Sequence, residues 1–168
     1  MLGEVAVMLA GAFLIFILLF IAIAVTLYLL LAFGLKRLSE REGLANSWMA
    51  FVPLLNLYLM GLIAERQSTQ SWKQHIPLAY PGLVVGSIIL DFIPVIGFLL
   101  SIASLVFGIY VMFLLYERYS SQAIPFTIFS VITLGILFPI LIFILRNNEK
   151  LTDADIKKID GPDPLNKY

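Results

Sequence analysis

The sequence contains no cysteine, and it contains few charged residues for its length. The lack of cysteine excludes disulfide bonds, thiolate metal sites, cysteine nucleophiles and lipid attachment to cysteine. Lysines plus arginines and aspartates plus glutamates number 11 each among the 168 residues. The formal net charge is therefore zero, and no overall field attracts nucleic acid to the protein.

The chain is richer in hydrophobic residues and poorer in charged residues than a soluble protein. Hydrophobic residues make up 61% of the chain and charged residues 13%, whereas soluble domains contain about 45–50% and about 25%. The mean hydropathy is +0.98. A chain with so few polar groups cannot cover a water-exposed surface, so we expect a lipid bilayer to surround most of it. This composition excludes a cytosolic enzyme, a secreted domain and a nucleic-acid-binding module.

Charged residues divide the chain into five uncharged runs, because an ionised side chain in the middle of a bilayer costs at least about 2.5–3.5 kcal/mol. A helix needs about 20 apolar residues to cross the hydrocarbon layer, and each run is close to this length or longer. The first run is too long for a cleavable signal peptide, and no lysine or arginine precedes it, so we expect a retained span. The runs are residues 5–35, 43–64, 74–90, 92–116 and 119–145.

The third and fourth runs are separated by a single charge, that of Asp91. Residues 76–116 are about twice as long as one crossing requires, so the chain must turn back within them. Pro94 and Gly97 follow Asp91 near the middle of this stretch, and both residue types interrupt helices. The sequence therefore predicts a helical hairpin whose tip lies at residues 91–97.

The second run is less regular, because residues 48–64 contain Pro53 and Asn56. They could cross the membrane fully or re-enter on the same side, and we favour the full crossing. The predicted fold is thus an all-α polytopic helical membrane bundle with about five transmembrane helices, or four plus a re-entrant segment.

The distribution of lysine and arginine near the ends of the spans predicts the orientation. With five crossings, residues 36–41 lie on the same side as the C-terminal tail, opposite Arg66, Lys73 and Arg118. The side with more positive charge is the cytoplasmic one. We therefore expect a multi-pass protein of the bacterial inner membrane, the plasma membrane of the cell, with its N-terminus outside and its C-terminus in the cytoplasm.

Two short polar segments complete the predicted organisation. Residues 39–42 are expected to form a short interfacial helix that Gly43 ends. Residues 1–146 form the transmembrane domain, and residues 147–168 form a short cytoplasmic tail. Residues 152–155 of this tail resemble a capping box that opens a short helix.

Small residues recur at helical spacing on two predicted spans. Such faces let helix backbones approach closely, which favours helix association in lipid. They could pack within the chain, or they could form the interface of a homo-oligomer or of a partner subunit. These candidate interface residues are Gly82 and Gly86 on the third span and Gly97, Ser101, Ser104 and Gly108 on the fourth.

Asn56 and Asp91 are the candidate polar residues within the apolar stretches. Asp91 in the middle of the bilayer would mark a proton or cation path, whereas in a turn at the headgroup layer it would cap a helix end. Asn56 can bond a backbone group that Pro53 frees or a neighbouring helix. His75, the only histidine, is expected to be an interfacial polar residue.

Catalytic and metal-binding patterns are missing from the sequence. It contains no His-Glu-x-x-His, no Gly-x-Ser-x-Gly and no phosphate-binding glycine loop. No lysine or histidine accompanies the hydroxyl groups of the spans to activate a nucleophile. We therefore predict a protein that is not an enzyme, with no catalytic residue, no metal and no cofactor.

Residues 48–58 carry the most specific pattern, Trp-x4-Pro-x2-Asn-x-Tyr. This pattern, after a short charged segment that ends in glycine, resembles a family of small multi-spanning bacterial membrane proteins of unknown function. The resemblance covers residues 36–64, and Met49 and Ala50 stand where that family has a Lys-Ser pair. It implies a bacterial polytopic fold and adds no chemistry.

Two classes of function follow from these observations. The first is a non-catalytic subunit or interaction partner of a membrane complex, which binds itself or another membrane protein through the small-residue faces. The second is a small channel or transporter that assembles as a homo-oligomer, with Asn56 and Asp91 along its path. The scarcity of polar residues in the spans favours the first class.

Overall fold

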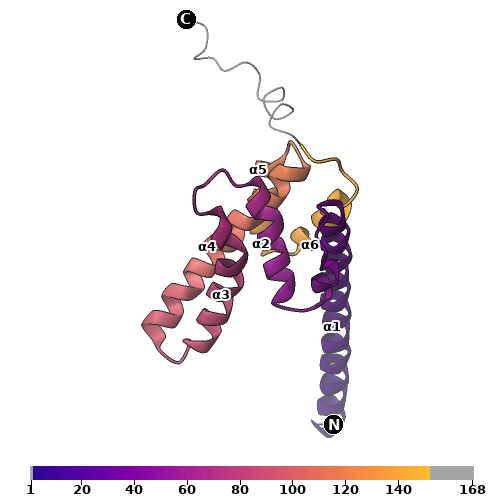
Figure 1. The fold of residues 1–168 in the computed structure, drawn as a ribbon. Helices are drawn as coiled ribbons and strands as arrows, with labels where there is room; N and C mark the ends of the chain where they lie inside the picture. The colour runs from indigo at the N-terminus through magenta and orange to yellow at the C-terminus, as the bar shows by residue number, and fades with distance from the viewer. Residues whose placement is uncertain (1, 152–168) are drawn as a thin grey trace, which may run out of the picture.

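A computed structural model describes residues 2–151, and every regular element in this range is helical, as the sequence predicted (Figure 1). Two of these helices, α1 and α4, are long and apolar enough to cross a membrane. The elements in chain order are α1 (Leu2–Arg41), η1 (Ser47–Phe51), α2 (Leu55–Gln67), η2 (Lys73–His75), α3 (Ile76–Ile89), α4 (Pro94–Tyr119), α5 (Ala123–Ile132) and α6 (Leu137–Leu145).

Helix α1 contains 40 residues and is therefore about 60 Å long. Its C-terminal half packs against η1, α2 and α6. Every residue from Val7 to Thr26 is exposed, and the N-terminal half extends away from the other helices as a single rod (Figure 1). This half of α1 has no packing partner within the described chain.

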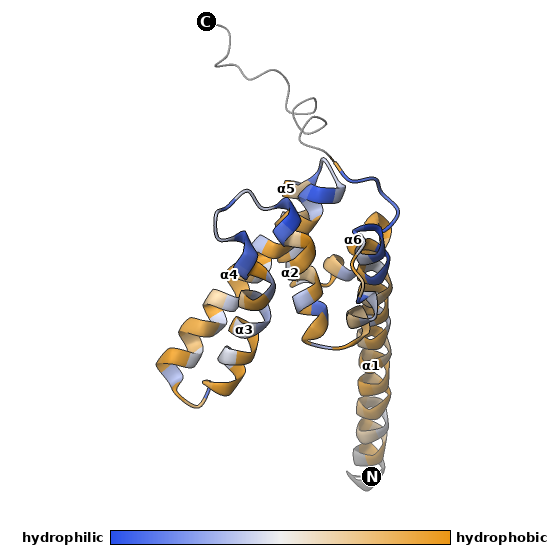
Figure 2. Ribbon diagram, viewed as in Figure 1, coloured by the Kyte–Doolittle hydropathy of each residue, from blue (hydrophilic) through white to orange (hydrophobic). Residues whose placement is uncertain are grey.

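Polar residues gather at one end of the molecule, which we call the polar end. Figure 2 shows the hydrophilic segments at the C-terminal ends of α1, α2 and α4 and in the segment after α6, while the remaining helices are mostly hydrophobic. Asp91 lies apart from this end, exposed in the turn between α3 and α4. The molecule therefore has one charged face and a long apolar body.

The predicted hairpin of residues 76–116 is confirmed. Helix α3 ends at Ile89 and α4 begins at Pro94, and the turn is closed by a hydrogen bond from the backbone N–H of Ile93 to the carbonyl of Leu90 (2.9 Å). Gly97 allows the tight return, because a Cβ atom at this position would lie 2.7 Å from the Cα of Asp91.

The segment of residues 48–64, for which a full crossing was favoured, is not one continuous helix. The chain breaks after η1, where Pro53 cannot donate a hydrogen bond and Leu54 adopts a positive φ of 68°. The two ends of this segment then meet at the polar end, since Arg66 Nη1 lies 2.9 Å from a carboxylate oxygen of Glu42. A full crossing would separate these two residues by about 30 Å, whereas the structure brings them into contact.

The single helix expected over residues 119–145 is also replaced by a hairpin. Helices α5 and α6 are separated by a turn in which Leu134 and Gly135 have φ values of 52° and 84°. The backbone N–H of Leu151, after α6, donates to the carbonyl of Arg118 at the end of α4 (2.9 Å). This segment, too, begins and ends at the polar end.

Two predictions about the charged segments change accordingly. Residues 39–41 continue α1, and Glu42 caps it, in place of a separate interfacial helix, although Gly43 does end the helix as expected. Arg66, Lys73 and Arg118 were placed opposite residues 36–41, but Arg66 and Arg118 contact Glu42 directly, and Lys73 lines the same cavity as both arginines. The predicted tail helix at residues 152–155 lies outside the described residues.

The apolar core lies directly beneath the polar end, where α2 and α6 pack between the C-terminal half of α1 and α4. A buried hydrogen bond of 2.7 Å between the hydroxyls of Tyr116 and Ser130 joins α4 to α5 within it. Gly61 lets α2 approach the first turn of α3 closely. The largest fully buried apolar side chains are Leu35, Leu38, Leu59, Ile63, Ile76, Val111, Leu115, Tyr116, Tyr119 and Ile142.

Replacing Gly61 by alanine tests this contact. The added Cβ would lie 2.6 Å from the Cα of Pro77, so Gly61→Ala should lower the free energy of unfolding by about 1–3 kcal/mol. Thermal unfolding in detergent, followed by circular dichroism, measures the loss. Gly82→Ala is the matched control, because no atom lies within 4 Å of its added Cβ and alanine favours a helix by about 0.5–1 kcal/mol. Equal melting temperatures for the two variants would contradict the close α2–α3 contact.

Candidate functional site

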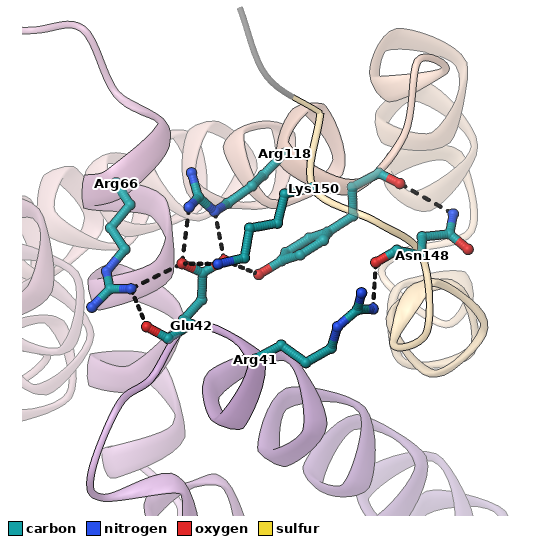
Figure 3. Close-up of polar contacts among 7 residues, drawn as sticks. Arg41, Glu42, Arg66, Arg118, Asn148 and Lys150 are labelled. Atoms are coloured by element: carbon teal, nitrogen blue, oxygen red, sulfur yellow. Dashed lines mark hydrogen bonds and ion pairs between the residues drawn. The ribbon is translucent and has the colours of Figure 1, made fainter. Parts of the chain in front are cut away.

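The candidate site is a buried carboxylate surrounded by cations at the polar end (Figure 3). We call its members, Glu42, Arg66, Arg118, Tyr119 and Lys150, the Glu42 cluster. The side chain of Glu42 has no exposed surface. Its partners come from the C-terminal ends of α2 and α4 and from the segment after α6, so the cluster joins parts of the chain far apart in the sequence.

The end of α1 positions Glu42. The backbone N–H of Gly43 donates to the carbonyl of Glu40, and that of Leu44 donates to the carbonyl of Ser39, both at 3.0 Å. This pair of bonds is the Schellman motif, which requires a left-handed residue after the helix, and Gly43 has a φ of 71°. Glu42 is thus the C-cap of α1, and the motif turns the chain away from the helix directly after it.

Three cations and one hydroxyl surround the Glu42 carboxylate. Arg118 donates to both oxygens through Nε and Nη2, each at 2.8 Å. The Tyr119 hydroxyl donates to Oε1 at 2.6 Å, and Arg66 Nη1 donates to Oε2 at 2.9 Å. Lys150 Nζ lies 3.4 Å from Oε2. Arg66 also donates to the backbone carbonyl of Glu42, so both the side chain and the backbone of Glu42 accept hydrogen bonds.

Neighbouring hydrogen bonds fix the chain after α6 against α1 and α4. Arg41 donates to the carbonyl of Arg146 at 3.2 Å and to that of Asn148. The amide of Asn148 donates to the carbonyl of Tyr119 at 3.1 Å. Together with the bond from Leu151 to Arg118 described above, these contacts bring Lys150 to the carboxylate. The first residues of the predicted tail are therefore packed on the bundle.

The cluster controls the ionisation of its acid. Burial alone raises the pKa of Glu42, but the hydrogen bonds from Arg118, Tyr119 and Arg66 outweigh it and lower the pKa to about 2. Burial and the bond to Glu42 raise the pKa of Tyr119. Glu42 is therefore a carboxylate at physiological pH.

A cavity of about 440 Å³ opens beside the cluster, and we call it the basic cavity. Cationic side chains dominate its lining, together with the hydroxyls of Ser68 and Thr69. Ser68 is buried and forms a hydrogen bond of 3.1 Å with the hydroxyl of Tyr110 on α4. The lining residues are Arg66, Gln67, Ser68, Thr69, Lys73, Arg118, Lys150 and Leu151.

The predicted small-residue faces fall in several different environments. A side chain at Gly82 would meet no atom within 4 Å, and one at Gly86 would meet only the end of Leu100. Gly97 packs on the hairpin turn, and Gly108 packs on Tyr80 of α3. The two ends of the α4 stripe thus pack within the chain, while the GxxxG of α3 makes no close helix contact.

The two serines of the α4 stripe differ from each other. Ser101 is exposed on the surface of α4. The hydroxyl of Ser104 is buried without a hydrogen-bond partner among the described residues, and it lines an apolar cavity of about 380 Å³ together with Tyr80, Gly108 and Ser130. The four residues of this stripe therefore have different surroundings.

The two candidate polar residues lie on different elements. Asn56 is buried in the first turn of α2, and Asp91 is exposed in the turn between α3 and α4. The residue that caps the start of α4 is Ile93, with no side-chain hydrogen bond. His75 is exposed at the end of η2. In the described part of the chain, no group of three or more His, Cys, Asp or Glu side chains could hold a metal ion.

Sequence reasoning used the charged members of the Glu42 cluster to divide the uncharged runs and to predict the orientation, and it did not bring them together. Glu42, Arg66 and Arg118 each stand at or next to the end of such a run. A signal was present in the sequence, because an acid, Glu42, follows the first apolar run, whereas arginines follow the second and the fourth.

In comparisons with known protein families, curated proteins and solved structures, none matches this chain.

Glu42→Gln tests the energetic role of the cluster. Removing one partner of a buried ion pair leaves the other uncompensated and costs about 3–5 kcal/mol, so the free energy of unfolding should fall by about that amount. The effect should also depend on pH. The pKa of Glu42 is about 2 in the folded protein and 4.5 ordinarily, so its stabilisation is complete above about pH 4.5 and decreases as the pH falls toward 2.

Thermal unfolding in detergent between pH 7 and pH 3 measures both effects. Glu40→Gln is the control, because this exposed acid pairs with Lys36 and Arg37 at 3.8 and 3.7 Å and should change the stability by less than about 1 kcal/mol. Wild type should lose stability below pH 4.5 more steeply than Glu42→Gln does. Parallel pH profiles for the two proteins would refute the assignment.

Proposed function

We propose that the chain is an integral membrane protein whose polar end faces the cytoplasm. What supports the proposal is that the eight lysines and arginines of the described residues all lie at or near that end, as the positive-inside rule requires. In this arrangement α1 crosses the membrane with its N-terminus outside. The α3–α4 hairpin reaches toward the far side, and the segments 43–67 and 119–148 re-enter from the cytoplasmic side.

We further propose that the protein is a non-catalytic subunit or interaction partner of a membrane complex, and that α1 is the helix that binds the partner. The observation that carries this proposal is the exposed N-terminal half of α1, whose most apolar 18-residue window is 0% buried. Ala10, Gly11 and Ala12 form its longest run of small residues, and small residues permit close helix contact in lipid. The resemblance of residues 48–58 supports a bacterial inner membrane.

The alternative, a channel or transporter made of several copies, has less support. Asn56 is buried inside α2 and Asp91 is exposed at the hairpin tip, so the two residues do not line a common path within one copy. A pore for ions or polar solutes would need more polar side chains along its length.

Single cysteines test the membrane arrangement, because the natural chain has none. We expect Gln70→Cys, Ser121→Cys and Asn147→Cys to react with a membrane-impermeant maleimide only after the cells are permeabilised. Gly3→Cys should react in intact cells. Five straight crossings would instead expose Gln70→Cys and Ser121→Cys on the outside, and that labelling pattern would overturn the re-entrant arrangement.

Affinity purification in mild detergent tests the proposed role of α1. We expect the wild-type protein to carry a second membrane protein or a second copy in stoichiometric amount, and two differently tagged copies distinguish these cases. Gly11→Leu should abolish the association while the melting temperature is unchanged, because no atom lies near this position. Leu18→Ile, in the same exposed half, should retain it. Recovery of only the monomer from wild type would contradict the proposal.

A further inference from the structure

We propose that the basic cavity binds a phosphate group, and that its natural ligand is an anionic phospholipid at the cytoplasmic surface. The site is distinct from the proposed partner-binding half of α1, and its phosphate-binding chemistry does not depend on that proposal. Four cationic side chains from α2, η2, α4 and the segment after α6 line one cavity. Phosphate is the common biological anion whose several oxygens can accept bonds from many such donors.

The first argument is an excess of positive charge. Glu42 is the only acid that contacts Arg66, Arg118 and Lys150 among the described residues, and Lys73 adds a fourth cation to the lining. One carboxylate thus contacts three of the four cations that line the cavity. The dipoles at the C-terminal ends of α1, α2 and α4 offset part of this charge, but their effect falls off within the last turn. An anion in the cavity would relieve the remaining repulsion.

The second argument is that donors remain available. Arg66 uses Nη1 for Glu42 and Arg118 uses Nε and Nη2, whereas a guanidinium group carries five N–H donors in all. The side chains of Arg66 and Lys150 are 40% and 38% exposed, and that of Arg118 is 14% exposed. The hydroxyl of Thr69 also lines the cavity. Glu42 holds these cations, and donors that it does not use remain on residues that line the cavity.

The third argument concerns the source of the phosphate. The segment from Ser68 to Lys73 lines both the basic cavity and, through Gln70 and Trp72, an apolar groove of about 740 Å³ between α3 and α4. Trp72 lies in this segment and packs against Phe107 and Tyr110, with ring centroids 6.0 and 5.9 Å apart. A phospholipid carries its phosphate next to an apolar chain, so it can use both surfaces at once. Free phosphate could use only the cavity.

A second basic region at the same end provides a comparison. Lys36, Arg37 and Arg146 line another cavity near the end of α1. Both Lys36 and Arg37 pair with Glu40, and the guanidinium of Arg146 stacks on the ring of Phe143 at 3.4 Å. These cations lie apart from the basic cavity, so a variant there changes the net charge of the polar end without changing the proposed site.

The experiment uses the full chain and the variants Lys73→Gln and Arg37→Gln. Lys73 lines the cavity without contacting Glu42, so its replacement spares the Glu42 cluster. In detergent, inorganic phosphate should raise the melting temperature of wild type and of Arg37→Gln, with sodium chloride of equal ionic strength as the blank. Lys73→Gln should weaken phosphate binding about tenfold or more, since a hydrogen bond to a charged group is lost.

Nanodiscs distinguish the two sources of phosphate. In equimolar phosphatidylglycerol and phosphatidylcholine, native mass spectrometry should find phosphatidylglycerol retained on wild type and Arg37→Gln and depleted on Lys73→Gln, and inorganic phosphate should compete with it. Phosphate binding without selective lipid retention would assign the cavity to free phosphate and overturn the lipid assignment. Equal losses in Lys73→Gln and Arg37→Gln, or no binding in either experiment, would overturn the site itself.

Discussion

The burial of one carboxylate determines how the chain is folded at its polar end. An ion without exposed surface is tolerated only when its charge is compensated at close range, and Glu42 finds this compensation in residues from three other segments. The segments that carry Arg66, Arg118 and Lys150 must therefore reach the C-terminal end of α1. The chain between any two of these residues has to return to its starting side, and it does so through helices joined by tight turns.

Much of the secondary structure could be predicted from residues alone. The hairpin of α3 and α4 follows from the length of its apolar stretch and from Pro94, because a stretch of that length cannot be one crossing. The break between α5 and α6 could not be foreseen in the same way. Residues 119–145 have the length of an ordinary span, and the turn depends on Leu134 and Gly135, where a single glycine is a weak signal for a reversal of the chain.

The candidate site was less predictable. Charged residues at the ends of an apolar run indicate that the chain reaches a membrane surface there, but they do not indicate which of the two surfaces it is. Assuming one crossing for each run placed Glu42 and Arg66 on opposite sides, whereas the structure brings them into contact. The small residues illustrate the same limit. Their spacing on α4 is regular, yet Gly97 and Gly108 face different neighbours, because the turn and helix α3 each approach only part of the helix.

The short returning helices also determine the shape of the protein. Helices α2, α5 and α6 contain 13, 10 and 9 residues, so each extends only about 13–20 Å, roughly half the thickness of the hydrocarbon layer or a little more. Only α1 and the tip of the α3–α4 hairpin continue beyond them (Figure 1). In the membrane arrangement proposed above, the protein would be a wedge with its larger cross-section in one leaflet. Such a wedge is accommodated with least lipid strain where the membrane is convex on the side of that leaflet.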